Sequence, residues 1–354
     1  MTESPRGVTV IICCHDSSKR LGPTLEHLAA QRASGNIPWE VLVIDNASSD
    51  GTAELARAVW PAGHPAPLRV IGESRLGLSY ARERGLAEAA YEYVSFVDDD
   101  NRVGPEWIRT VCDVFDRAGE VGACGGAIEA VLEAEAPRWF SQYEHNFAVG
   151  NRGPVGRYTT YYEIWGAGLS LRRSAWEQLR QAGFSPCLTD RRGKGLSSGG
   201  DTELCAALTM LGWKLWYDPR LRLEHCMPSG RLTWSYLRRL WRSFGYASVA
   251  LGWYGYALRG RPATWEEAFR RTWIFNVLWC VYWLARRGSA LLTEKEGSSE
   301  QIFAESVLGK AQALLSGFRA YHQGAEKVQK LCQAAAGPAN GRTPGFAVSR
   351  SAEG

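Results

Sequence analysis

The stretch Tyr93-Val94-Ser95-Phe96-Val97-Asp98-Asp99-Asp100 carries most of the information about the fold of this chain. Its mostly apolar part is typical of a buried strand, yet it ends in clustered carboxylates, which repel one another unless a cation lies between them. Oxygen ligands suit a hard divalent ion such as Mg²⁺ or Mn²⁺, which commonly bridges a protein carboxylate to substrate phosphates. The alternative is a solvated turn in which Asp100 or Asn101 caps a helix that begins near Pro105.

The residues before this stretch alternate between apolar strands and helical patterns. The sequence predicts strands at 8–14, 41–44, 68–71 and 94–97, and helices at 21–31, 52–59 and 79–90. Such alternation is typical of βαβ units, so we expect an α/β fold with a mostly parallel central sheet flanked by helices. Ligands of such sheets bind beyond the carboxyl ends of the strands. Asp45, Asn46 and the three aspartates fall at those ends, which favours a functional role for them.

The rest of the chain divides into a mixed part and a helical part. Residues 105–118 predict a helix, and 122–132, 164–172, 214–217 and 221–225 predict strands. From residue 232 to 336 the pattern is helical, and the Gly-, Pro- and Ser-rich segment 337–354 is expected to be disordered. We therefore expect a first domain over 1–231, a helical region over 232–336 and a tail.

Composition narrows the class of protein. The chain has 354 residues, 45% of them hydrophobic, which is enough for a large core. Its nine cysteines are scattered, odd in number and never spaced as CxxC, which argues against a disulfide framework or a zinc site. We expect reduced thiols and a cytoplasmic location. The segment before Val8 is short and polar, so no signal peptide is expected.

Positive charge is concentrated in one segment. Residues 231–287 hold ten arginines, two glutamates and seven of the fifteen tryptophans, so this segment carries +8 and the remaining residues −4. Two uncharged runs within it, 244–258 and 273–285, are shorter than the ~20 residues that a spanning helix needs. Either the runs form buried helices against the first domain, or a helix lies in the interface of an anionic membrane, at its inner face.

Five segments in order resemble family 2 glycosyltransferases with the GT-A fold. They are VTVIICCHD (8–16), VIDNASSDGT (43–52), FVDDDN (96–101), WGAGLSLRR (165–173) and GGDTEL (199–204). The resemblance covers roughly residues 8 to 245 and implies inverting transfer of a hexose from a nucleoside-diphosphate sugar, with a UDP-sugar favoured, to an acceptor hydroxyl. It also implies that the donor lies on about 1–104, the acceptor on about 105–231, and that the acceptor is a glycan, a lipid-linked sugar or another hydroxyl compound.

The resemblance also implies roles for donor-site residues. Cys13 and His15 would flank the nucleotide at the end of the first strand, and Asp45 with Asn46 would contact the base. Arg82 would reach the diphosphate, although a surface arginine paired with Glu83 or Glu88 is the alternative. Asp98 and Asp99 would contact the ribose or a ligated water. Asp100, in the Asp-x-Asp pair with Asp98, would ligate Mg²⁺ or Mn²⁺ together with His225, and a structural histidine is the alternative for His225.

For the transfer itself the resemblance points to Asp201 as the general base. An inverting displacement needs one group that takes the acceptor proton, and Asp201 matches the family's position; it also stands where a helix cap would be expected. Gly166 and Gly168 would form the floor where sugar and acceptor meet, and Trp165 would stack on a sugar, with a core tryptophan as the alternative. Gly200 replaces the usual Glu, so that the function of this Glu is either missing or supplied by Glu203, which would then contact the acceptor.

Two other functions are compatible with parts of this pattern. A nucleotidyltransferase of related fold would also place carboxylates at strand ends, but no Gly-rich loop with a Lys or Arg follows the first strand. A degenerate binding protein could use the arginine- and tryptophan-rich segment on nucleic acid, with steep salt dependence. The carboxylate set favours the transferase, so no nucleic-acid partner is expected.

Overall fold

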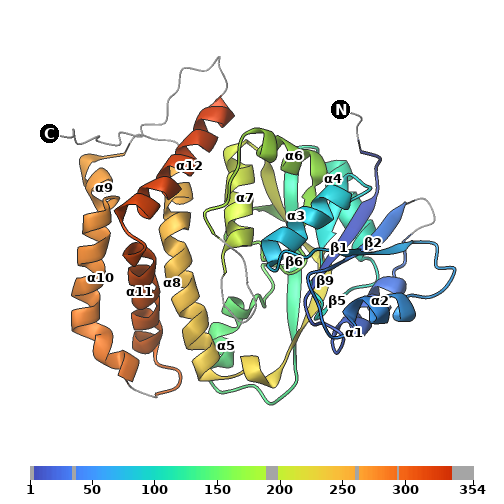
Figure 1. The fold of residues 1–354 in the computed structure, drawn as a ribbon, viewed down its shortest axis with the longest axis horizontal. Helices are drawn as coiled ribbons and strands as arrows, with labels where there is room; N and C mark the ends of the chain where they lie inside the picture. The colour runs from blue at the N-terminus through green and yellow to red at the C-terminus, as the bar shows by residue number, and fades with distance from the viewer. Residues whose placement is uncertain (1–3, 34–36, 189–197, 260–262, 293–294, 337–354) are drawn as a thin grey trace.

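The computed structural model describes residues 4–33, 37–188, 198–259, 263–292 and 295–336. It shows a central sheet flanked by helices, joined to a bundle of helices at the C-terminal side (Figure 1). The predicted tail 337–354 lies outside the described residues. None of the helices within the described ranges is long and apolar enough to cross a bilayer.

The first half of the sheet is parallel, as the alternation of strands and helices predicts. Its strands are β1 (Val8–Cys14), β2 (Trp39–Asp45), β3 (Leu68–Gly72) and β4 (Tyr93–Phe96), linked by α1 (Leu21–Ala29), α2 (Thr52–Val59) and α3 (Leu78–Glu88). They lie in the order β3-β2-β1-β4, with every pairing parallel. The carboxyl ends of β1, β2 and β4 therefore meet at one edge, which places their polar residues together.

The second half of the sheet mixes directions. It contains β5 (Asn101–Val103), β6 (Val121–Leu132), β7 (Arg157–Thr159), β8 (Ser170–Arg172) and β9 (Lys214–Met227), with helices α4 (Trp107–Arg117), α5 (Phe140–Tyr143), α6 (Arg173–Gln181) and α7 (Gly200–Met210). The predicted strand 164–172 is wrong in length, because Gly168 has a φ of +74° and only β8 pairs. The two short strands predicted at 214–217 and 221–225 are one strand, β9.

The C-terminal region is helical, as predicted. Its helices are α8 (Trp234–Ala257), α9 (Trp265–Arg270), α10 (Trp273–Arg287), α11 (Ser299–Leu315) and α12 (Phe318–Ala336), with a short 3₁₀ turn over Ser229–Arg231 before them. α8 and α11 touch backbone to backbone: a Cβ on Gly245 would lie 1.9 Å from the Ser306 carbonyl oxygen, and one on Gly309 1.8 Å from that of Arg242. Glycine is required wherever two backbones approach so closely.

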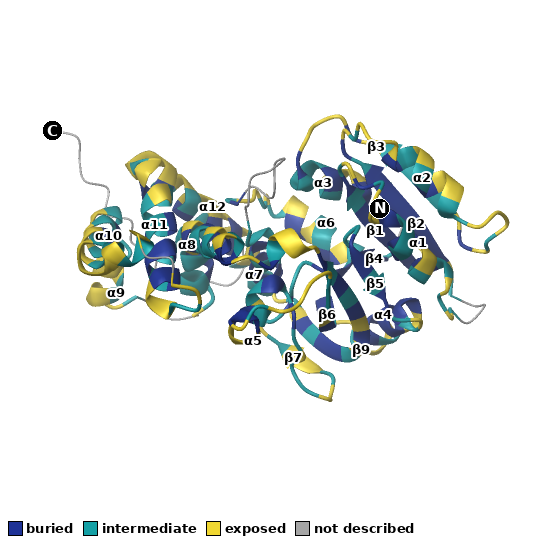
Figure 2. Ribbon diagram, turned by 90° about the horizontal axis from the view of Figure 1, so that it is seen from below, coloured by how far each residue is buried: buried dark blue, intermediate teal, exposed yellow. Residues whose placement is uncertain are grey.

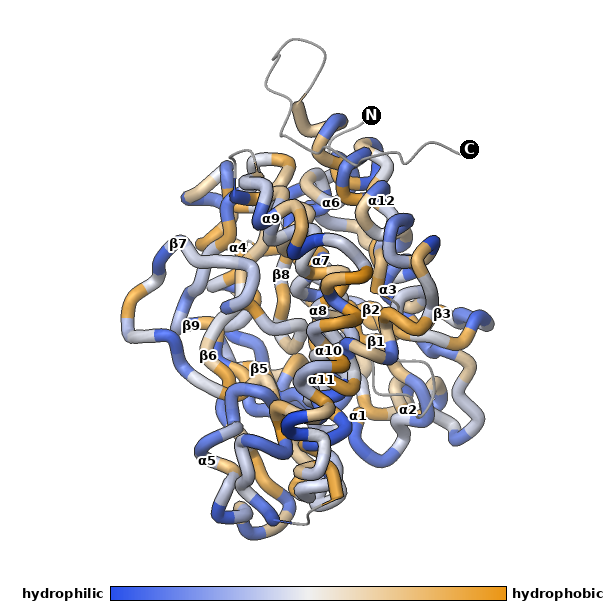
Figure 3. The backbone as a smooth tube through the Cα atoms, turned by 90° about the vertical axis from the view of Figure 1, so that its left-hand side faces the viewer, coloured by the Kyte–Doolittle hydropathy of each residue, from blue (hydrophilic) through white to orange (hydrophobic). Residues whose placement is uncertain are grey.

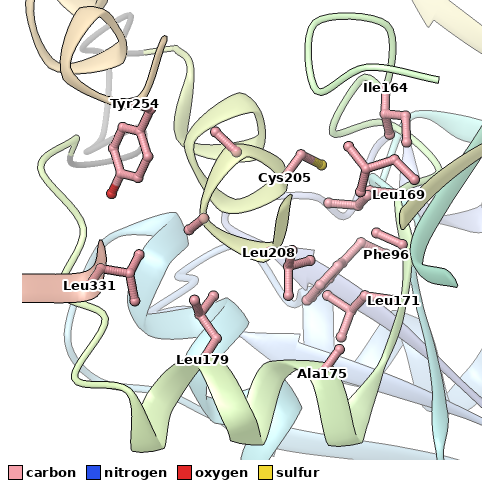
Figure 4. Close-up of a cluster of buried hydrophobic side chains, with 14 of the residues drawn as sticks. Phe96, Ile164, Leu169, Leu171, Ala175, Leu179, Cys205, Leu208, Tyr254 and Leu331 are labelled. Carbon is pink, nitrogen blue, oxygen red and sulfur yellow. The ribbon is translucent and has the colours of Figure 1, made fainter. Parts of the chain in front are cut away.

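The sheet and the C-terminal helices share one hydrophobic core. Tyr254 of α8 and Leu331 of α12 belong to the same buried cluster as Phe96 of β4 and Leu171 of β8 (Figure 4). The first uncharged run, 244–258, therefore lies in a helix packed against the first domain. The second run lies in α10, where only Asn276 and Cys280 are buried and exposed residues follow the outer side (Figure 2).

Candidate active site

A cleft of about 630 Å³ opens at the carboxyl edge of the parallel strands. One wall is formed by the ends of β1, β2 and β4 with α3, and the opposite wall by Tyr236, Leu240 and Phe244 of α8. Because α8 follows the expected boundary at residue 231, the cleft lies between the two predicted regions. The helical region is thus part of the site.

The three aspartates after β4 face different partners. Asp99 accepts a hydrogen bond from the Ser17 hydroxyl and pairs with Arg20, whose Nη2 lies 2.8 Å from Oδ2. Burial raises the pKa of Asp99, and Arg20 opposes that shift. Asp99 therefore ties the β4 end to the loop after β1, and it lines the cleft together with Asp98 and Asp100.

Asp100 lies beside His225 because β5 pairs antiparallel with β9, with Asn101 opposite His225. The His225 Nε2 is 3.9 Å from Asp100 Oδ1. Arg231 bridges the two residues, with Nη2 3.0 Å from Asp100 Oδ2 and Nη1 2.9 Å from His225 Nε2. Arg231 was not predicted as a site residue. The one feature of the sequence that indicates it is its position six residues after His225, in a segment rich in arginine.

The hydrogen bonds of His225 define its tautomer. Nδ1 lies 3.0 Å from the Phe147 carbonyl oxygen, which can only accept, so Nδ1 carries the proton. Burial lowers the pKa of His225, and Asp100 opposes this. The lone pair of Nε2 then accepts the hydrogen bond from Arg231 Nη1, beside Asp100. Metal-ligating histidines are commonly oriented by the same kind of bond from the other ring nitrogen.

The donor atoms here fit part of a divalent-metal site. A carboxylate oxygen and an imidazole lone pair converge, and both are acceptable to Mn²⁺ and, for the carboxylate, to Mg²⁺. No group of three or more His, Cys, Asp or Glu side chains with metal-site geometry occurs in the described parts of the chain. Asp100 and His225 would thus hold an ion only together with phosphate oxygens and water. Arg231 would then have to give up its hydrogen bond to His225 Nε2, because that nitrogen would bind the ion.

Asp201 reaches the cleft from the first turn of α7. Its Oδ2 accepts a hydrogen bond of 2.6 Å from the Gly166 backbone N–H, and Oδ1 accepts one from Thr202 N–H. The N-cap of α7 is Gly199, with no capping side chain. The alternative that Asp201 is the helix cap is therefore wrong, and its carboxylate is directed at the 164–168 segment.

Arg82 and Gly166 complete this end of the cleft. Arg82 projects from α3 with its guanidinium 5.5 Å from the Phe96 ring centre. A Cβ on Gly166 would lie 2.9 Å from Asp201 Oδ2 and 3.3 Å from Arg82 Nη2. The missing side chain thus leaves room for both groups at one point, so the predicted arginine and the predicted base lie close together.

The residues predicted to contact the nucleotide base lie near one another but differ in exposure to the cleft. The Asn46 amide donates to the Glu73 and Arg75 carbonyls and accepts from Gly77 N–H. It therefore holds the turn before α3, although the residue lines the cleft with Cys13 and His15. The carboxylate of Asp45, at the end of β2, accepts a hydrogen bond from Ser48 N–H. Asp45 is not among the residues that line the cleft.

The predicted acceptor residues divide in the same way. Trp165 and Gly166 line the cleft, and the Arg152 guanidinium lies 4.6 Å from the Trp165 ring centre. Gly168 packs instead beneath the floor, where a Cβ would lie 2.8 Å from Trp107. Sequence reasoning missed Arg152, because nothing in its neighbourhood indicates that it stacks on a cleft tryptophan.

The prediction that Glu203 contacts an acceptor does not fit its position. Glu203 is fully buried and accepts hydrogen bonds from Cys187 N–H, Leu188 N–H and the Tyr254 hydroxyl. Burial raises its pKa. It joins α7 to α8 and is oriented away from the cleft, since a helical residue two positions after Asp201 faces another side.

The chain is similar in sequence and in fold to known glycosyltransferases. Residues 9–179 match the model of glycosyl transferase family 2. The glucosyl-dolichyl phosphate glucuronosyltransferase of Haloferax volcanii is 24% identical over 268 residues, covering 74% of this chain and 79% of that protein. The succinoglycan biosynthesis protein ExoM of Rhizobium meliloti is 24% identical over 236 residues, covering 65% and 71%.

A solved structure shows the same fold. The structure of S. aureus TarS 1-349 in complex with UDP-GlcNAc covers 93% of this chain and 90% of that one, with 15% identity and a TM-score of 0.50. The family match decides between the functions left open by the sequence in favour of sugar transfer. Residues 9–179 therefore resemble a family 2 glycosyltransferase domain, and the chain as a whole is similar in sequence and fold to glycosyltransferases.

Proposed function

We propose that the protein transfers a hexose from a UDP-sugar to a hydroxyl of a lipid-linked or polymeric glycan, with inversion at the anomeric carbon. The observation that carries this proposal is the single cleft that brings together Asp98, Asp100, Arg82 and Asp201 from separate parts of the chain. The TarS complex supports a UDP-sugar donor by analogy of fold. The Haloferax and Rhizobium relatives, named for glucosyl-dolichyl phosphate and for succinoglycan, support the acceptor class.

Charge on the leaving group explains the cluster at the β4 end. The nucleoside diphosphate gains negative charge as its bond to the sugar breaks, and Arg82 and Arg231 both line the cleft where that charge would lie. Asp100 and His225 would hold Mg²⁺ or Mn²⁺, which supplies Lewis-acid neutralisation of the diphosphate when bound. Asp98 would contact the ribose or a ligated water.

Asp201 is the group that takes the acceptor proton. As the acceptor oxygen forms its bond to the anomeric carbon, the bond to the β-phosphate oxygen breaks and the hydroxyl proton passes to the Asp201 carboxylate. The hydrogen bond from Gly166 N–H orients this carboxylate. Trp165 beside Gly166 offers an aromatic face to a sugar ring.

The reaction is proposed for the cytoplasm. All nine cysteines are free thiols, which supports a reducing compartment.

A thermal-shift screen tests the identity of the donor: UDP-, GDP-, dTDP- and CDP-sugars are added with and without Mn²⁺. We expect a UDP-sugar to raise the melting temperature most, and more with Mn²⁺, because a ligand stabilises only the state that binds it. A protein that none of the four sugars stabilises would contradict the proposal.

A further inference from the structure

Exposed apolar side chains gather on the outer helices. Nine of the fourteen large hydrophobic residues exposed in the described chain lie between 265 and 318. Four belong to α10: Ile274, Leu278, Val281 and Tyr282 are 57%, 59%, 58% and 50% exposed. Their spacing of four, three and one residues places them along a single side of a helix. We call these four residues the α10 face; burying them would gain free energy, so this helix side is suited to a partner.

The α10 face is directed away from the catalytic sheet. α10 packs on α11, which packs on α8, so the free side of α10 is the outermost surface of the helical region (Figure 1). Figure 3 faces this side and shows hydrophobic residues along α10. Behind the face, Trp279 and Trp283 pack on Phe303 of α11. The helix is therefore anchored from within while its outer side stays uncovered.

Arginines lie at both ends of the α10 face. α10 contains no Asp or Glu, and it ends in Arg286 and Arg287, with Arg270 just before it. Arg287 stacks over Trp283 and Phe303, and Arg286 donates to the Tyr282 hydroxyl at 2.7 Å, which leaves further N–H groups on both for an anion. Arg270 is paired with Glu266 of α9. An apolar stripe with arginines at its ends complements a surface that is apolar inside and anionic outside.

A second copy of the chain fits this surface poorly. Two α10 helices packed antiparallel would bring Arg270 of one copy toward Arg286 of the other, and packed parallel they would bring Arg286 toward its own equivalent. Like charges at an apolar contact are destabilising. Insertion across a bilayer fits no better, because the 15 residues of α10 span about 22 Å against about 30 Å of hydrocarbon.

We infer that the α10 face binds an anionic membrane surface, with α10 lying in the plane of the interface. Ile274, Leu278 and Val281 enter the boundary between headgroups and acyl chains, and the arginines lie at the level of lipid phosphates. Tyr282 lies between the two environments, where aromatic rings with a polar tip are favoured. The proposed sugar transfer would then occur at the surface that carries a lipid-linked acceptor.

Vesicle sedimentation tests the inference without any assay of sugar transfer. The full chain is mixed with vesicles of phosphatidylcholine alone or with added phosphatidylglycerol. We expect binding only to the anionic vesicles, and weakening with added salt. Leu278→Glu with Val281→Glu is expected to lower the partition coefficient roughly tenfold or more, because two side chains lose their burial. Val155→Glu, at a still more exposed apolar position outside the helical region, is the control and should bind like the unmodified chain.

The arginines are tested separately. Arg270→Gln with Arg286→Gln should weaken binding to anionic vesicles by roughly tenfold, whereas Arg109→Gln with Arg117→Gln on α4 should not. Absence of binding to anionic vesicles, or binding that the α10 variants leave unchanged, would overturn the inference. Self-association that the α10 variants abolish, without vesicle binding, would assign the face to a second copy and overturn it too. Transfer activity on a soluble acceptor should be unchanged in these variants, so this inference and the proposed function fail independently.

Discussion

Helices α8 and α10 contain similar uncharged, aromatic runs, yet one is part of the core and the other faces solvent. α8 meets α11 through Gly245 and Gly309, whose missing side chains let the two backbones touch. α10 has no glycine within Trp273–Arg287 and buries only Asn276 and Cys280. Both runs lack charged residues, and the placement of small residues distinguishes the helix that packs from the helix whose outer side remains free.

The difference extends to function. α8 is a wall of the cleft, so a change there or in the opposite carboxylates should alter sugar transfer. α10 lies outside the cleft, so changes on its face should alter membrane binding alone. Variants in each region can separate sugar transfer from membrane binding. A variant in one region that alters both activities would contradict this separation.

The largest effect is expected at Asp201. Asp201→Asn keeps the size and the contact with Gly166 N–H but removes the base, so the transfer rate should fall by about 10²–10⁴-fold. Calorimetry with a UDP-sugar should give unchanged donor affinity, and vesicle binding should also be unchanged. Asp113→Asn on the outer side of α4 is the control. An unchanged transfer rate in Asp201→Asn would show that another residue is the base.

The next effect is expected at Asp100. Asp100→Ala should reduce turnover roughly 10²-fold or more and remove the Mn²⁺-dependent part of donor binding, because the leaving diphosphate loses its neutralising partner. Removing metal from the unmodified protein with EDTA should have the same result, reversed by added Mn²⁺ or Mg²⁺. Full activity in EDTA would contradict the role given to Asp100 and His225.

A smaller effect, on stability, is expected where α8 meets α11. Glu305 is fully buried between Arg238 and Arg242, with Oε1 2.8 Å from Arg238 Nε. Glu305→Ala leaves both arginines without their carboxylate and should lower the free energy of unfolding by about 3 kcal/mol. Glu266→Ala, which breaks the exposed pair with Arg270, should cost less than about 1 kcal/mol. Urea denaturation of both variants measures the difference, and equal losses would contradict the burial contrast between α8 and the outer helices.

The smallest effect concerns pH. Burial raises the pKa of Glu203 above its ordinary 4.5, so the folded state holds this proton more tightly than the unfolded state. Its contribution to stability is therefore full below pH 4.5 and is lost as the pH rises through the raised pKa. Glu203→Gln does not titrate, so its free energy of unfolding, relative to that of the unmodified protein, should increase with pH by at most about 1.4 kcal/mol per pH unit. Urea denaturation at a series of pH values measures this, and a difference that does not vary with pH would contradict it.

Much of the catalytic half follows from the sequence because strand ends are local features. The apolar run before Asp98 and the run before Asp45 predict parallel strands, and parallel strands bring their carboxyl ends to one edge. The roles of Asn46 and Glu203 could not be predicted, since each depends on backbone groups distant in sequence. The role of Arg231 could not be predicted either, because its contact with Asp100 is set by the pairing of β5 with β9.

Whether each of the two uncharged runs is buried or exposed could not be predicted from the sequence either. Both were compatible with a buried helix or an interfacial one, and the spacing of residues within one run does not show which partner helix it meets. The close approach at Gly245 depends on Gly309, which is more than sixty residues away. Such long-range pairs are visible only in the folded structure.

Hydrogen exchange with a UDP-sugar and Mn²⁺ tests the central claim most directly, because it reports where the donor binds. Protection is predicted at the ends of β1 and β4 and around His225 and Arg231, with none along α10. In Asp100→Ala the protection around His225 should be lost. Protection confined to segments outside the cleft, or none at concentrations that saturate the thermal shift, would contradict the assignment of the active site.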